Sequence, residues 1–120
     1  MATDVTVIDP KATNHAGINL TDATYTPLTS GTDADLNWEG TAAIVVKNTN
    51  ASSRQLTFTV PVPSGTALAD IGSTPDPKIY TLSGNKEYYF RNADSFRDPT
   101  TGKTTFQVNG TDCYAIGIAF

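Results

Sequence analysis

The chain has 120 residues, with 12 acidic and 8 basic side chains and a net charge of −4, which suits one domain with a single core. The few, scattered cations disfavour nucleic-acid binding, and no stretch approaches the roughly 18 apolar residues of a membrane span. The single cysteine cannot form an intrachain disulfide, and the 20 threonines, against two glutamates, favour strands over helices.

The first expected elements are short. Residues 4–8 contain a run of β-branched side chains and predict a strand that ends at Asp9-Pro10. Residues 11–37 are dominated by small polar side chains, which indicates an extended arm with one short strand around residues 23–28. We therefore expect residues 1–38 to form an N-terminal strand and polar arm, and residues 39–120 to form the core of one domain.

The clearest strand patterns lie between residues 42 and 60. Residues 42–47 form a continuous apolar run, typical of a strand covered on both faces. Residues 54–60 alternate, which places Leu56, Phe58 and Val60 on one face. The polar turn cluster between the two segments predicts that they form a hairpin.

Four further strands are expected at residues 78–82, 87–91, 103–108 and 113–120. Within the second of them, Tyr88 and Tyr89 are predicted to point to opposite faces. The Asn109-Gly110 turn predicts a second hairpin between the last two strands. One face of the last strand holds only small residues, which favours close packing against another layer or a neighbouring chain; they are Cys113, Ala115, Gly117 and Ala119.

These elements predict an all-β fold. With turn signals at regular intervals, we expect a single-domain antiparallel β-sandwich of the jelly-roll or Ig-like type. It would have about seven to eight strands and an extended N-terminal arm.

Motifs for chemistry are absent from the sequence. His15 and Cys113 form the one conceivable nucleophile pair, and we expect an unrelated loop histidine and a small buried thiol instead. The Asp33/Asp35 and Asp94/Asp98 pairs match no calcium loop. We therefore expect no enzyme, no catalytic residues, no cofactor and no metal site.

The strand and turn pattern resembles that of small tailed-bacteriophage virion proteins of the capsid decoration type, also called cement or head auxiliary proteins. The resemblance covers mainly residues 40–120. The segments that carry it are residues 5–8, 44–48, 56–61, 80–82, 87–90, 101–103, 106–108 and 115–120.

The resemblance implies a structural virion protein, made in the host cytoplasm and placed on the capsid surface. It would bind the major capsid protein and stabilise the outer surface of the capsid, as a trimer at capsid three-fold positions. It would bind no nucleic acid and no membrane. The alternatives are another virion component (a tail, head–tail joining or fibre-associated protein) or a carbohydrate-binding or adhesin module that uses Trp38 and an exposed tyrosine.

The expected partner contacts lie near the N-terminus. A strand at residues 4–8 can add to the edge of a partner's sheet through main-chain hydrogen bonds. The candidate contacts are Val5, Val7, Ile8 and Trp38. Deletion of residues 1–10 is expected to leave a folded domain that no longer binds capsids.

Overall fold

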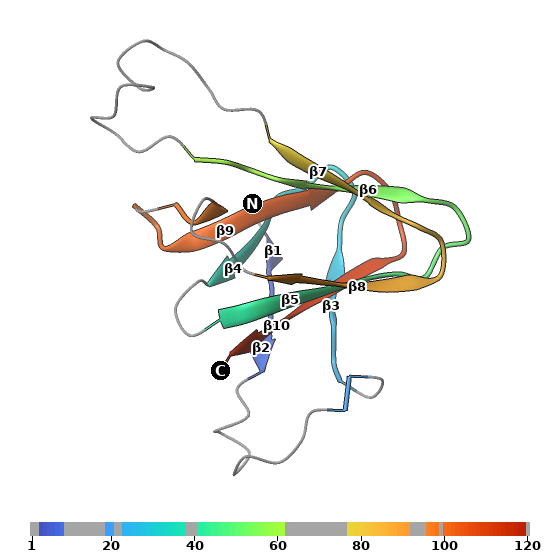
Figure 1. The fold of residues 1–120 in the computed structure, drawn as a ribbon, viewed down its shortest axis with the longest axis horizontal. Coiled ribbons are helices and arrows are strands. Elements are labelled where there is room, and N and C mark those ends of the chain that lie inside the picture. The colour runs from blue at the N-terminus through green and yellow to red at the C-terminus, as the bar shows by residue number, and fades with distance from the viewer. Residues whose placement is uncertain are drawn as a thin grey trace.

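The computed structural model of the protein describes residues 3–8, 19–20, 23–37, 41–61, 77–91, 96–98 and 100–119, with the backbone alone at residues 41 and 42. Their regular structure consists of ten strands in two mixed sheets (Figure 1), which confirms the all-β class. The strands outnumber the seven to eight expected, because the N-terminal third supplies four short ones. None of the described residues forms a helix long and apolar enough to cross a membrane.

The first sheet has five strands in the order β1-β4-β9-β6-β7. Its strands are β1 (Thr3–Asp4), β4 (Ala34–Asn37), β9 (Lys103–Val108), β6 (Arg54–Phe58) and β7 (Lys78–Leu82). All neighbours in it are antiparallel except β1 and β4, which run parallel. Within the described chain, β7 forms one edge of this sheet and β1 the other.

The second sheet is built around the last strand. Its strands are β2 (Val7–Ile8), β3 (Thr26–Leu28), β10 (Cys113–Ala119), β5 (Thr41–Asn48) and β8 (Lys86–Arg91). They follow the order β2-β10-β5-β8, and β3 pairs with β10 beside β2. The β2–β10 pair is parallel, so the expectation of a wholly antiparallel sandwich is wrong for the N-terminal strands.

One apolar core joins the inner faces of the two sheets. Leu56, Phe58 and Phe106 contribute from the first sheet, and Ile44 and Val46 from the second. Phe58 lies at its centre, within 6 Å of four other aromatic rings: Tyr80, Phe90, Phe96 and Phe106. The small face of β10 turns toward this core through Cys113 and Ala115, which confirms that it packs against another layer.

A second apolar cluster covers the outer face of the second sheet. Val45, Ile116 and Ile118 form it, and Ile8 and residues from the N-terminal third pack over them. Those covering residues are Leu20, Ala23 and Tyr25. Both faces of β5 are therefore buried, as its continuous apolar sequence predicts.

Most successive strands cross from one sheet to the other, and only β2–β3 and β6–β7 stay within one sheet. Strand β5 lies in the second sheet and β6 in the first, and the same separation holds for β9 and β10 (Figure 1). Both predicted hairpins are therefore wrong. Each segment has one strongly apolar face, and the two faces meet across the core rather than lying side by side in one sheet.

Four of these crossings gather at one end of the sandwich, which we call the arch end: residues 29–33, 49–53, 83–85 and 109–112. Backbone hydrogen bonds join them to one another and to the strand ends. Asn85 N donates to Asn50 O, and Thr49 N donates to Asp112 O. Asn85 and Asp112 adopt left-handed backbone conformations, with φ of 57° and 66°, which asparagine and aspartate tolerate better than other non-glycine residues.

Asn48 is the buried polar residue that ties the arch end to the core. Its Nδ2 donates to the carbonyl oxygens of Ser52 and Leu82, at 2.9 and 3.0 Å, and its Oδ1 accepts from the Asn50 N–H. The arch beside it also packs closely, since a Cβ at Gly84 would collide with the Ala51 carbonyl. These contacts explain why the turn cluster bends the chain across the core.

Candidate functional site

The predicted N-terminal contact residues lie within the chain's own sandwich. Val5 is only 7% exposed and belongs to the inter-sheet core, while Val7 packs against that core and Ile8 against the outer cluster. The segment passes from β1, parallel to β4, into β2, parallel to β10. Trp38 lies outside the described residues. That these four residues contact a partner stays a prediction.

This placement changes the meaning of an N-terminal deletion. Removing residues 1–10 takes Val5 out of the core, removes β1 from the first sheet and β2 from the second. The structure therefore predicts that the deletion destabilises the domain, contrary to the expectation that it stays folded. A loss of binding after that deletion would not distinguish a lost contact from a lost fold.

The outer face of the first sheet is a broad polar surface, which we call the Thr face. It carries Gln55 and Thr57 from β6, Ile79 and Thr81 from β7, and Thr105 and Gln107 from β9. Ile79 is 55% exposed and is the single large apolar side chain exposed on this face in the described chain. An exposed isoleucine framed by short polar side chains has the composition of a protein contact: an apolar anchor with a polar rim.

Lateral hydrogen bonds fix part of the Thr face in place. Thr105 Oγ1 donates to Asp35 Oδ1 at 2.8 Å, and Gln107 Nε2 donates to Asp33 Oδ1 at 2.6 Å. Asp33 and Asp35 thus accept hydrogen bonds from side chains of the neighbouring strand β9. Side chains held in this way lose less conformational freedom when a partner binds, which favours a flat, ready-made contact surface.

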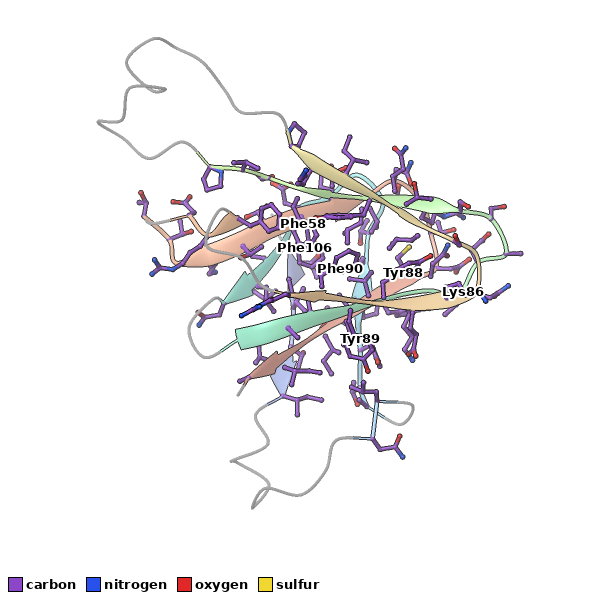
Figure 2. The ribbon with its side chains drawn as sticks, in the orientation of Figure 1. Phe58, Lys86, Tyr88, Tyr89, Phe90 and Phe106 are labelled. Atoms are coloured by element: carbon purple, nitrogen blue, oxygen red, sulfur yellow. The ribbon has the colours of Figure 1, made fainter. Side chains whose placement is uncertain are left out.

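A second exposed surface lies on β8. Tyr88 and Phe90 point into the space between the sheets, whereas Tyr89 points away from it (Figure 2). Tyr89 is 62% exposed, so the prediction that Tyr88 and Tyr89 face opposite ways is confirmed. Together with Tyr25, Lys47 and Glu87 on the same side of the sheet, Tyr89 forms what we call the Tyr89 patch.

The Tyr89 patch is internally paired. The Lys47 ammonium lies 3.9 Å from the centre of the Tyr25 ring and 3.8 Å from a Glu87 carboxylate oxygen. The Tyr25 hydroxyl is buried near Glu87 without meeting it in full hydrogen-bond geometry. Burial of the phenol, reinforced by the charge of Glu87, raises the pKa of Tyr25 to about 12.

The raised pKa of Tyr25 predicts a loss of stability in alkali. An unfolded tyrosine ionises near pH 10, roughly, whereas the folded Tyr25 keeps its proton to about pH 12. Between these values the unfolded state binds fewer protons, so the free energy of unfolding falls as the pH rises. Urea unfolding from pH 9 to 11 should show a steeper fall for the wild type than for Tyr25→Phe. Equal slopes in the two proteins would contradict the assignment.

The reactive groups of the described chain do not form a catalytic arrangement. Cys113 is 1% exposed, and burial raises the pKa of its thiol, which is the opposite of the activation that a cysteine nucleophile needs. His15 lies outside the described residues. No group of three histidine, cysteine or acidic side chains that could hold a metal ion occurs among the residues that the structure describes.

Two shallow hollows flank the arch end. One, of about 390 Å³, lies between β3 and the start of β10 and is lined by residues 27–30 and 111–114. The other, of about 310 Å³, lies beside the start of β8, with Lys47, Lys86 and Glu87 in its wall. Both are open, and in the first the Cys113 thiol is buried with a raised pKa, which does not suit a nucleophile. The exposed surfaces, rather than these hollows, are the stronger candidate site.

Sequence reasoning predicted that one of Tyr88 and Tyr89 points outward, without choosing between them, and it missed Ile79. The alternation of β7 places Ile79 on the opposite face from Tyr80 and Leu82, which is the outer face of the first sheet, and there it is 55% exposed. No known protein family, curated protein or solved structure matches the chain.

Proposed function

We propose that this chain is a structural virion protein of a tailed phage that decorates and stabilises the outer surface of the capsid by binding the major capsid protein. The strand and turn pattern that resembles decoration proteins supports the proposal. The structural observation that carries it is the Thr face, a five-stranded surface with Ile79 exposed at its edge. We also propose the jelly-roll form of the sandwich, because successive strands repeatedly alternate between the sheets.

The shape and chemistry of the Thr face suit a capsid contact. Its polar side chains, hydrogen-bonded from β9 to Asp35 of β4 and to the preceding Asp33, form a surface that can lie flat on a protein shell. Copies linked to one another on a symmetric lattice would add their contacts as avidity, so each contact can be modest. Ile79 would be the apolar anchor of each contact.

Copy number in purified particles tests the proposal. Quantitative mass spectrometry of particles from the phage that encodes the chain should find hundreds of copies per particle, as expected for a surface lattice. About six to twelve copies would instead indicate a tail or head–tail joining role, in line with the symmetry of those structures. Absence of the chain from the particles would overturn the proposal.

The contact surface can be tested separately on capsids that lack the protein. Recombinant Ile79→Ser should occupy such capsids at least about tenfold more weakly than the wild type, as expected for a buried apolar anchor. Lys86→Ser is the control, because Lys86 is exposed at the arch end and lies away from the Thr face. Equal weakening by both substitutions would place the contact elsewhere.

Carbohydrate binding is the second candidate, and Tyr89 is the observation that favours it. An exposed tyrosine ring beside Tyr25 offers a flat apolar surface on which a sugar ring can stack. A glycan array with the purified chain distinguishes the two functions. Saturable binding that Tyr89→Ser abolishes would support the carbohydrate module over a pure decoration protein.

A further inference from the structure

Strand β8 has an open edge. Among the described residues it pairs only with β5, through six consecutive registers from Asn48↔Lys86 to Ala43↔Arg91 without a bulge. No other strand of the described chain pairs with the backbone N–H and C=O groups on its other side. Natural edge strands are usually guarded by proline, bulges or central charges, and the centre of β8 is Tyr88-Tyr89-Phe90, which has none of these.

We propose that two copies of this chain associate edge to edge through β8, as an antiparallel pair centred on Tyr89. The two second sheets would then form one continuous sheet across a two-fold axis. This inference does not depend on the proposed capsid function, because it rests on β8 alone.

The charges of β8 select this register. A two-fold axis perpendicular to the sheet places the core-facing sides of both copies on the same side of the joined sheet. The outward residues of one β8 must therefore lie opposite outward residues of the other. The outward residues are Glu87, Tyr89 and Arg91. Centring the pair on Tyr89 places Glu87 of each copy opposite Arg91 of the other, twice. Centring it on Tyr88 or Phe90 would place a charged side chain opposite Tyr89 instead.

The inward side chains fit the same register. Tyr88 of each copy would lie opposite Phe90 of the other, beside the aromatic cluster around Phe58. These two rings are only partly buried in the single chain, and the pairing would cover them further. Aromatic pairs across strands and opposite charges across strands both stabilise a sheet, so both faces of β8 support one alignment.

The charged partners are available for this contact. Arg91 is exposed and forms no ion pair within the described part of the chain. Glu87 contacts Lys47 through one carboxylate oxygen at 3.8 Å, and the Glu87 side chain is still 47% exposed. A two-fold pair uses the same surface on both copies and closes on itself, so it gives a dimer and not a fibre.

Charge reversal tests the proposal. In Arg91→Glu each acid would face an acid, and in Glu87→Arg each base would face a base, so either variant alone should weaken self-association by about tenfold. Mixed together, the two variants would oppose unlike charges at both positions and should form a heterodimer. Sedimentation equilibrium measures the self-association, and native mass spectrometry identifies the mixed pair.

One control variant and one alternative variant complete the charge-reversal test. Lys86→Glu makes the same charge change as Arg91→Glu but lies outside the opposed pairs, so it should leave association unchanged. Tyr89→Lys replaces Glu87→Arg if the latter fails to fold beside Lys47, since it would set two cations face to face at the two-fold axis. Circular dichroism confirms that each variant is folded.

The outcomes separate this inference from the proposed function. A wild type that stays monomeric at all concentrations, or an oligomer that Arg91→Glu does not weaken, overturns the β8 pairing. A trimer whose assembly Arg91→Glu does not weaken also overturns the β8 pairing, but it does not contradict the proposed capsid role. A β8 dimer formed by a chain that is absent from particles overturns the capsid role alone.

Discussion

Replacement of Phe58 by Ala is expected to lower the free energy of unfolding by about 3–5 kcal/mol, as for other buried large aromatic residues. Phe58 is 1% exposed, and its ring stacks on Phe96 at a centroid distance of 4.8 Å. It also meets Phe90 edge to face across the two sheets, at 5.6 Å. Truncation would therefore leave a cavity lined by rings from both sheets, which cannot collapse without moving one sheet against the other.

Urea unfolding followed by tryptophan fluorescence or circular dichroism measures this loss. The adjacent Thr57→Ala is the control, because Thr57 lies on the outer Thr face and its change should stay within about 0.5 kcal/mol. If Phe58→Ala costs less than about 1 kcal/mol, the ring does not occupy the centre of the core.

Replacement of Asn48 by Leu is expected to cost about 2–4 kcal/mol, although leucine has a similar volume. The change removes the donor to Leu82 O, which lies 3.0 Å away in a buried position, and the acceptor of the Asn50 N–H. Each buried backbone group left without a partner costs about 1–3 kcal/mol. The hydrogen bonds that Asn48 makes thus matter more than the space it fills.

The control for Asn48 lies in the same arch. Ser52 receives the Asn48 hydrogen bond on its backbone carbonyl, which Ser52→Ala retains. Ser52→Ala should therefore be close to neutral in the same urea experiment. A loss for Asn48→Leu no larger than for Ser52→Ala would show that the amide network contributes little.

The sequence predicted strand positions better than strand partners. Residues 78–82 and 103–108 form strands at the predicted bounds, because their alternation marks one buried face. The Asn109-Gly110 turn was assigned to a hairpin, yet its strands lie in different sheets. A reversal signal reports that the chain turns back, and it does not report whether the returning strand pairs with the first or lies above it.

The sequence predicted too few strands in the N-terminal third, for a related reason. Strand β4 contains only two apolar residues, Ala34 and Leu36, and Leu36 is completely buried. Its alternation with Asp35 and Asn37 is a weak signal beside so many polar residues. Pairing with β9 decides its structure, and that partner lies about seventy residues away, as the Asp35–Thr105 hydrogen bond shows.

The candidate site was predictable only in part. The alternation of β8 places Tyr88 and Tyr89 on opposite faces, but the exposure of Ile79 and Tyr89 depends on which sheet faces stay uncovered and on the edge positions of β7 and β8. Edge position is a property of the sheet order, which no local pattern encodes. The lateral hydrogen bonds of the Thr face likewise join β9 to Asp35 of β4 and to the preceding Asp33, across a long sequence separation.

The crossings between sheets also constrain how the chain folds. No hydrogen-bonded strand pair in the described chain joins strands linked by a tight turn, and even β6 and β7 are separated by residues 59–77. A folding nucleus cannot therefore begin as a local hairpin and must close long loops before sheet hydrogen bonds form. Such topologies fold slowly, in roughly milliseconds to seconds, and their strand edges stay exposed meanwhile. The chain contains many threonines, and each has a polar hydroxyl that limits aggregation of strands that have not yet paired. Because threonine is also β-branched, it favours the same strands once the sheets have formed.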